Sequence, residues 1–264
     1  MRLVNFVTRP DAPWCQMHNL PFRPFEGLYL KDDFAVNEGV ADATLGELDW
    51  EFVTIANASS TAYLVTTNTV PGRPGIFRDT TAGTADGDGE VYRLDEDNIV
   101  LQGGYTGSFS FGVRIPAATG NALAGNDFRI GLQDSVTATE PTVGIWVFCD
   151  AGVLSLQADS ADHGDAADTF DLTGLTTNTT LALDDWLDCK VSWSGTNAQG
   201  GPKYVVAEAQ VNGGGFRKVA EITDCHIDDD EEMEFSIVHY QNSGGADTLE
   251  LDVDYVDLLL QGRG

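Results

Sequence analysis

Apolar residues alternate with polar or small residues along much of the chain. The clearest alternating stretches are residues 108–115, 128–132, 187–194, 205–211 and 249–256. Because successive side chains of a strand point to opposite faces, a period of two predicts a half-buried β-strand at each of them. No stretch of about 12 residues combines the i, i+3, i+4 apolar spacing of a helix with a capping residue. The pattern therefore predicts an all-β protein.

Two of these stretches predict further detail. Residues 205–211 run into Asn212-Gly213, a dipeptide suited to a type I′ hairpin turn, and the returning strand is expected to begin near Phe216. In the last stretch, the alternation predicts that four apolar side chains share one face of a strand. These are Leu249, Leu251, Val253 and Tyr255.

Glycine and proline are spaced as in a protein of many short strands joined by turns. The chain contains 29 Gly and 9 Pro among its 264 residues. Antiparallel strands with one packed and one solvated face form β-sandwiches, and about a dozen such strands fit between residue 28 and residue 264. We therefore expect residues 28–264 to form one antiparallel β-sandwich of the jelly-roll type.

Residues 1–27 have a different character. They contain four prolines with aromatic residues between them, which is too apolar for a solvated tail and too proline-rich for a helix. We expect an extended N-terminal arm that packs either on its own sandwich or on a partner protein or subunit. In the second case the residues that anchor it to the partner are Phe6, Trp14, Phe22 and Phe25.

Acidic residues outnumber basic ones threefold. The 42 Asp and Glu against 14 Lys and Arg give a formal net charge of -28 and an isoelectric point near 4.1. Phosphate backbones and anionic bilayers repel such a chain, so we expect no direct nucleic-acid binding and no membrane association. No apolar run approaches the roughly 18 residues of a membrane span, and the N-terminus lacks the apolar core of a signal peptide. We expect a soluble protein without its own export signal.

The usual motifs of metal sites and nucleophilic catalysis are missing from the sequence. The cysteines show no C-x-x-C pair and no histidine at zinc-finger spacing, so we expect mostly buried thiols, although one disulfide is compatible with the sequence. The histidines share no triad-like spacing with Ser or Cys. The sequence contains neither the phosphate-binding motif G-x-x-x-x-G-K-[ST] nor a G-x-G-x-x-G that links a strand to a helix. The cysteines are Cys15, Cys149, Cys189 and Cys225.

A series of short motifs follows the predicted strands. They are D-D-F at 32–34, G-E-L-D-W at 46–50, P-G-I-F-R at 74–78, F-R-I-G-L at 128–132, G-I-W-V-F at 144–148, W-x-x-x-K-V at 186–191 and D-Y-x-x-L at 254–258. This series resembles the concanavalin A-like (LamG-like) jelly-roll domains of tailed-phage virion proteins, over about residues 32–260. The resemblance implies the fold and a non-catalytic module on the surface of a head, fibre or tail.

The segment Glu47-Leu48-Asp49-Trp50-Glu51 is the sharpest enzymatic candidate. On a strand, Glu47, Asp49 and Glu51 would share one face. The motif resembles the E-x-D-x-E strand of retaining jelly-roll glycosidases, in which one Glu attacks the anomeric carbon and another protonates the leaving oxygen. In those enzymes the strand lies mid-chain and faces a cleft, whereas here it directly follows the first strand. We therefore favour a solvated acidic face, with Trp50 buried, over catalysis by Glu47 and Glu51.

Asp86, Asp88 and Glu90 alternate with glycines, as oxygen ligands of a calcium loop do. The spacing fails the EF-hand pattern, because the sixth position is Val91 and the twelfth is Asp97. We therefore expect no cofactor and favour a plain polar turn, with a loose Ca²⁺ site as the weaker alternative.

Two further groups have structural interpretations. The acidic run over residues 228–234 predicts a solvated loop or a cation-screened contact between subunits. Trp146, Trp186 and Trp193 lie in strand patterns, so we expect core positions rather than sugar-binding platforms.

Together these observations predict a non-enzymatic structural protein of a phage virion, displayed on the particle surface after assembly in the host cytoplasm. Its most concrete form is a head decoration or cement protein, held partly by the arm on the major capsid protein or other virion proteins. We expect a homo-oligomer, with a trimer as the default. The first alternative is a tail or fibre module that binds host glycans through its loops; the second is a glycoside hydrolase that uses Glu47 and Glu51.

Overall fold

The computed structural model describes residues 27–34, 44–45, 48, 50–56, 59–64, 73, 75–82, 85–94, 99–118, 121–134, 137–177, 179–242 and 248–261. The four proposed anchors of the arm therefore lie outside the described residues, as do Glu47, Asp49 and Cys15. The described part of the chain consists of strands and their connections, without a helix, as the alternation predicts.

Sheet A has eight strands and sheet B has nine, and every pairing is antiparallel. Sheet A has the order β15(Arg217–Ile222), β14(Tyr204–Val211), β13(Leu187–Ser194), β8(Thr106–Arg114), β17(Thr248–Gln261), β5(Phe77–Ala82) and β4(Ser59–Leu64), with β1(Gly27–Asp32) also paired to β17. Sheet B has the order β12(Gly164–Thr169), β11(Val153–Ser160), β10(Gly144–Asp150), β9(Asn126–Gln133), β16(Glu232–Gln241), β6(Gly89–Arg93), β3(Trp50–Ile55) and β2(Thr44–Leu45), with β7(Ile99–Val100) also paired to β16.

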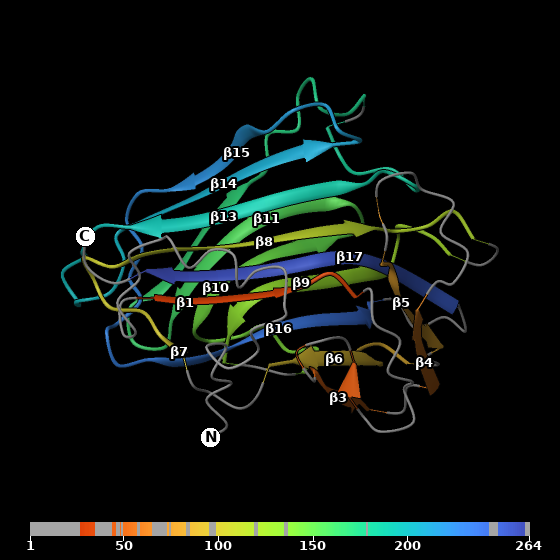
Figure 1. Ribbon diagram of the computed structural model, residues 1–264, viewed down its shortest axis with the longest axis horizontal. Coiled ribbons are helices and arrows are strands. Elements are labelled where there is room, and N and C mark those ends of the chain that lie inside the picture. The colour runs from red at the N-terminus through yellow and green to blue at the C-terminus, as the bar shows by residue number, and fades with distance from the viewer. Residues whose placement is uncertain are drawn as a thin grey trace, which may run out of the picture.

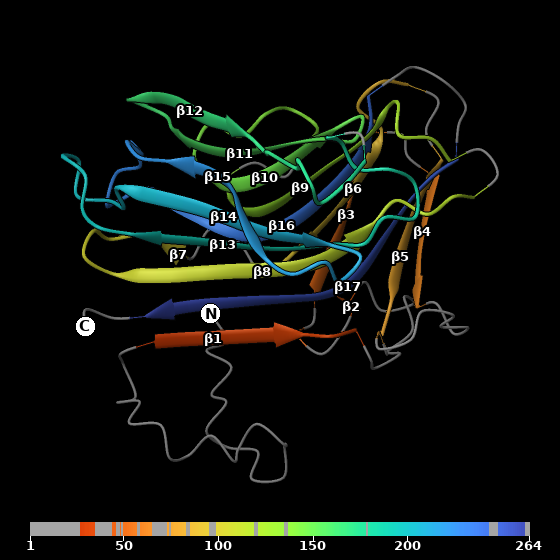
Figure 2. The same cartoon turned by 90° about the horizontal axis from the view of Figure 1, so that it is seen from above.

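The two sheets stack face to face, which confirms the predicted antiparallel β-sandwich. Figure 1 looks onto sheet A, whose strands β15, β14, β13, β8, β17 and β1 follow one another from top to bottom, with sheet B behind. The view turned by 90° shows the strands of the two sheets as separate layers (Figure 2).

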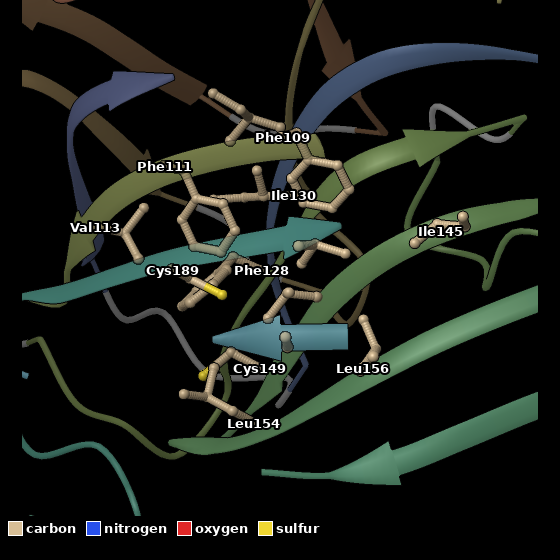
Figure 3. Close-up of a cluster of buried hydrophobic side chains, with 14 of the residues drawn as sticks. Phe109, Phe111, Val113, Phe128, Ile130, Ile145, Cys149, Leu154, Leu156 and Cys189 are labelled. Atoms are coloured by element: carbon tan, nitrogen blue, oxygen red, sulfur yellow. The ribbon is translucent and has the colours of Figure 1, made fainter. Parts of the chain in front are cut away.

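The core lies between the layers and is built from the apolar halves of the alternating strands. Phe109, Phe111 and Val113 of β8 face Phe128 and Ile130 of β9, and all of them are fully buried (Figure 3). Burial of large apolar side chains is the main stabilising contribution to such a fold, at about 25 cal/mol per Å² of apolar surface.

Three cysteines also contribute to the core. Cys149, Cys189 and Cys225 are free and buried, which confirms the prediction of buried thiols for these three. Burial raises the thiol pKa of each, to about 11 for Cys225, so they remain protonated and unreactive at neutral pH.

A β-bulge corrects the predicted face of the last strand. The register of β17 against β8 shifts between Val253 and Tyr255. Before the shift Leu251 and Val253 point into the core, as predicted; after it Val256 and Leu258 do so, and Tyr255 points outward. The extra residue of a bulge exchanges the two faces of a strand, so the prediction for Tyr255 was wrong.

The turn after β14 is longer than the predicted two-residue hairpin. Asn212 and Gly213 have φ angles of 51° and 76°, the left-handed pair that a type I′ turn requires. The returning strand β15 begins at Arg217, so the connection spans residues 212–216. Three consecutive glycines, residues 213–215, allow this looser loop.

Polar groups connect the two sheets at one end of the core. Asp79 of β5 contacts Nδ1 of His239 on β16 and accepts a hydrogen bond of 2.7 Å from the hydroxyl of Tyr92 on β6. The other ring nitrogen of His239 lies 2.9 Å from Oδ1 of Asn126 on β9. All four side chains are buried, so these contacts supply the partners that buried polar groups need.

Asp32 organises the start of the sandwich in a similar way. This buried carboxylate at the end of β1 accepts hydrogen bonds from the backbone N–H of Phe34 at 2.8 Å and of Leu48 at 3.2 Å. It also accepts from Nε1 of Trp50 at 3.0 Å. The D-D-F and G-E-L-D-W motifs therefore join strand β1 to strand β3, which is a structural role.

Candidate interaction surface

Three residues of the glycosidase-like motif at 47–51 lie within the described part of the chain, namely Leu48, Trp50 and Glu51, and they have structural partners. Trp50 is fully buried, as predicted. Glu51 lies half-exposed on β3, where its Oε2 accepts a hydrogen bond of 2.8 Å from Nε of Arg93. Glu51 thus has a partner on the neighbouring strand β6, which is a structural role.

The candidate calcium residues do not converge. Asp86 is exposed, Asp88 is buried and accepts from the backbone N–H of Ala85 at 3.0 Å, and Glu90 is fully buried on β6. Burial and the nearby Asp79 carboxylate raise the pKa of Glu90 to about 9, so it is neutral at pH 7. Within the described ranges, no group of three or more His, Cys, Asp or Glu is placed to hold a metal ion.

The acidic run at residues 228–234 is not one solvated loop. Glu231 accepts hydrogen bonds from the Ser160 hydroxyl at 2.8 Å and from the backbone N–H of Asp228 at 2.9 Å. Strand β16 begins at Glu232, and Glu234 within it is buried. The prediction holds for the exposed pair at 229–230 only, because the β-strand continues into the acidic sequence.

The predicted core tryptophans are buried, with exposed fractions of 0% for Trp146, 5% for Trp186 and 3% for Trp193. Only Trp193 belongs to the cluster between the sheets. Trp146 alternates with Ile145 and Val147, which point inward, so it lies on the outer face of sheet B.

The loop between β9 and β10 folds back over this outer face of sheet B. Arg129 of β9 donates through Nη1 to the carbonyl oxygen of Thr139 at 2.7 Å and through Nη2 to that of Thr137. Its guanidinium also lies 5.5 Å from the ring centre of Tyr240. Residues 137–139 therefore pack against the outer face of β9.

Arginines from two strands neutralise one buried carboxylate on the outer face of sheet A. Arg78 of β5 donates through Nε to Oδ1 of Asp252 at 2.6 Å, and Arg114 of β8 donates through Nη2 to Oδ2 at 2.5 Å. Asp252 is fully buried, so it depends on both guanidinium groups. This cluster fixes the relative position of three strands.

A third arginine extends the cluster toward β13. Arg73 donates at 2.7 Å to both Asp188 and Asp254. Its guanidinium stacks on the ring of Trp186 at 4.1 Å, and that of Arg114 lies 4.9 Å from the same ring. Cation–π contacts of this kind hold the arginines flat against the sheet.

A row of charged side chains crosses the same face. The strand registers place Glu208, Lys190, Ser110, Asp257 and Lys31 side by side on β14, β13, β8, β17 and β1. Ser110 donates a hydrogen bond of 2.8 Å to Asp257. Burial raises the pKa of Asp257, and this hydrogen bond, together with the positive charges of Lys31 and Lys190, opposes that rise. The row is thus electrostatically connected across four strands, β13, β8, β17 and β1.

A second row, with apolar ends and small polar residues at its centre, runs beside it. It contains Val206, Ser192, Ser108, Leu259 and Tyr29, again one residue from each of the same five strands. Tyr29 is 45% exposed. A broad sheet face with paired charges, small serines and exposed apolar groups suits contact with another protein.

This surface could not be recognised in the sequence. The alternation places Arg114, Lys190 and Asp188 on the outer sides of their strands, but the order and register of five strands bring the two rows together. The hydrophobic pattern decides which face of a strand is buried, and it does not decide which strands are neighbours in the sheet.

One shallow depression lies at an end of the sandwich. It has a volume of about 160 Å³ and is half open, with Trp193 and Tyr105 in its wall and the side chains of Gln102 and Gln261 beside them. Thr106, also in the wall, donates a hydrogen bond of 3.2 Å to Gln261. Ligand pockets for drug-sized molecules are larger, at about 300–1,000 Å³, so the depression suits a small group or part of a longer chain.

Comparisons with known proteins define the fold. No family model and no curated sequence matches the chain. Among solved structures it is similar to a protein of unknown function from Shewanella oneidensis MR-1, with 9% identity and a TM-score of 0.64 over 96% of this chain and 95% of that one. It is also similar to the botulinum neurotoxin serotype D binding domain, with 14% identity and a TM-score of 0.49 over 90% of this chain and 49% of that one. Its similarity to peanut lectin has 10% identity and a TM-score of 0.48 over 89% of this chain and 98% of that one.

Proposed function

We propose that the protein is a non-enzymatic structural protein of a phage particle, displayed on the particle surface as a head decoration protein and held partly by its N-terminal arm. The observation that carries this proposal is the outer face of sheet A, where ion pairs within the sheet satisfy the buried charges and five strands present a surface suited to contact between copies of the chain, while the arm binds the particle. The partners are the major capsid protein or other virion proteins.

The net charge of -28 supports an outside location. Packaged DNA would repel such a chain inside a capsid, whereas an acidic outer coat keeps particles soluble and apart. The short motifs of the sequence agree with this assignment, because they resemble virion jelly-roll domains and occupy structural positions at Asp32, Trp50 and Arg78.

Absence of enzymatic activity is part of the proposal. Of the three carboxylates of the E-x-D-x-E motif, Glu51 lies within the described residues, and it is bound to Arg93, which also lies 3.7 Å from Glu234. A catalytic carboxylate must be able to reach its substrate, whereas Glu51 is engaged by an ion pair between two strands of the sheet.

Quantitative mass spectrometry of purified particles of the virus that encodes the chain tests the location. Hundreds of copies per particle, in a fixed ratio to the major capsid protein, are expected for a head decoration protein. A few copies would place the chain in the tail, and absence from the particle would overturn the proposal.

Deletion of residues 1–26, which leaves strand β1 intact, tests the anchoring role of the arm. Loss of particle binding with an unchanged circular dichroism spectrum and melting temperature is expected. A variant that does not fold would show that the arm packs on its own sandwich.

A glycan-binding tail or fibre module is the second candidate, and the depression with Trp193 and Tyr105 favours it. An aromatic ring beside amide groups offers an apolar face and hydrogen bonds to a sugar ring. Tyr105→Ala should then abolish binding to host surface polysaccharide, whereas Phe216→Ala, which removes an exposed aromatic ring elsewhere, should not. Wild-type protein that binds no polysaccharide would exclude this candidate.

A further inference from the structure

The charged row on sheet A is antisymmetric about its central strand. From β14 to β1 its signs are negative (Glu208), positive (Lys190), neutral (Ser110), negative (Asp257) and positive (Lys31). Each charge therefore has an opposite charge at the same distance on the other side of β8. Because strands lie about 4.8 Å apart, the four charges lie about 5 and about 10 Å from Ser110.

We propose that this face binds a second copy of the chain, sheet A against sheet A, around a two-fold axis that runs parallel to β8 and passes over Ser110. An isologous contact brings each residue opposite the position that lies equally far beyond the axis. Glu208 then faces the partner's Lys31, and Lys190 faces the partner's Asp257. Both pairs occur twice, and their long side chains span the roughly 10 Å between stacked sheets. This inference does not depend on the virion proposal.

The second row fits the same axis. Val206 faces the partner's Tyr29, and Leu259 faces the partner's Ser192, so the exposed ring of Tyr29 and the half-buried Val206 are covered. At the centre Ser108 faces its own copy, and its small side chain lets the two sheets approach closely. The same two-fold axis therefore places opposite charges opposite one another in the charged row and covers the apolar ends of the second row.

Displaced axes satisfy fewer of the charges. Moving the axis over β13 places Lys190 against its own copy, and moving it over β17 does the same to Asp257. An axis between β17 and β1 opposes only Asp257 and Lys31, and it leaves Glu208 and Lys190 outside the contact. An axis perpendicular to the strands places each charge opposite its own copy. Like charges opposite one another in an interface cost several kcal/mol, so the axis over β8 is favoured because it places all four charges opposite charges of the other sign.

The size of the face and the scarcity of lysine agree with such a pair. Five strands of about eight residues cover about 24 Å by about 26 Å, or about 600 Å² per copy, which is at the lower end for specific complexes. Two chains of charge -28 repel each other, but at physiological ionic strength this repulsion is screened beyond about 8 Å. Two of the four lysines in the chain, Lys31 and Lys190, lie in this row.

Sedimentation velocity of the full-length chain and its charge variants at 0.15 M NaCl tests the proposal. The wild type should sediment as a dimer. Lys190→Glu places a glutamate opposite the partner's Asp257, and the two-fold axis repeats this like-charge pair a second time. The variant should therefore weaken association at least about tenfold. The double variant Lys190→Glu with Asp257→Lys restores opposite charges and should dimerise again.

Arg217→Glu is the matched control, because it reverses the same charge at an exposed residue of β15, one strand beyond the contact. Arg217 lies opposite Ala209, which belongs to the core, whereas Lys218 lies opposite Glu208 of the charged row. The dimer should therefore stay intact in Arg217→Glu. Circular dichroism and melting temperature establish that each variant folds, and Lys190→Gln provides a milder version if Lys190→Glu does not. A wild type that is monomeric or trimeric, a Lys190→Glu variant that still dimerises, or equal loss in Arg217→Glu would overturn the proposal.

Discussion

His239 of sheet B and Asp79 of sheet A contact each other through Nδ1 and Oδ2 in the buried space between the sheets. Asp79 also holds the hydroxyl of Tyr92, so removing the carboxylate leaves two buried polar groups without their partner. We expect Asp79→Ala to lower the free energy of unfolding by about 3–5 kcal/mol in urea titrations. Asp162→Ala, at an exposed turn, should change it by less than about 0.5 kcal/mol. Equal effects would show that the contact between the sheets contributes little.

Glu90 makes stability depend on pH. Its pKa is about 9 in the folded protein against an ordinary value of 4.5, because burial and Asp79 disfavour the charged form. The folded state thus keeps a proton that the unfolded state has lost. This contribution is fully present below pH 4.5 and is lost as pH rises toward 9, by about 1 kcal/mol per pH unit.

The neutral variant Glu90→Gln should remove this dependence. Urea titrations at pH 5 and pH 8 should show that Glu90→Gln is stabilised relative to the wild type at pH 8 but much less so at pH 5. Parallel pH profiles for the two proteins would contradict the assigned cause.

Asp252 distinguishes buried from exposed ion pairs. Because Arg78 and Arg114 both depend on it, Asp252→Ala should lower the free energy of unfolding by about 3–5 kcal/mol. Lys218→Ala removes the exposed 2.8 Å pair with Glu221 and should cost less than about 1 kcal/mol. Denaturant titration of both variants measures the difference, and a similar cost for both would refute this ranking.

Gly131 on β9 is needed because its neighbouring strand approaches so closely. A Cβ at this position would lie 2.3 Å from the carbonyl oxygen of Ile145 and 2.7 Å from Cα of Trp146. These are backbone atoms of an interior strand and cannot move aside, so Gly131→Ala should cost at least about 2 kcal/mol. Gly164→Ala, which has open space around it, should cost only the strain of its positive φ, about 1 kcal/mol. Comparable melting temperatures for the two variants would count against this account.

The alternation of apolar residues predicted β8, β13 and β14 well, because each has one face in the core. It also predicted the strand at β9, but the expected half-burial was wrong: all eight residues of β9 are buried, and on its outer face Arg129 is covered by residues 137–139. In β17 it failed at Tyr255, since a bulge adds one residue without any local sequence signal. The sequence after the bulge is compatible with Val256 and Leu258 pointing into the core. Only the pairing with β8 shows at which residue the inward and outward faces of the strand exchange.

The interaction surface was harder to predict than the strands. Lys31, Lys190 and Asp257 lie far apart in the sequence, and they form a row only because β17 inserts between β8 and β1. The pattern of charges along a sequence shows which charged residues share a face of one strand. This row takes one residue from each of five strands, so the pattern does not show it. The arm that the sequence did single out lies outside the described residues, so its role stays a prediction.

The position of β17 also determines how sheet A can form. Without this strand, the described part of sheet A falls into three unjoined parts, which are β15–β14–β13–β8, β5–β4 and β1. The pairing of Gly27 with Gln261 joins residues that lie far apart in the sequence, and such non-local pairing is slow to form. Sheet A therefore becomes continuous only when β17 pairs with β8, β5 and β1, and this step is expected to come late in folding.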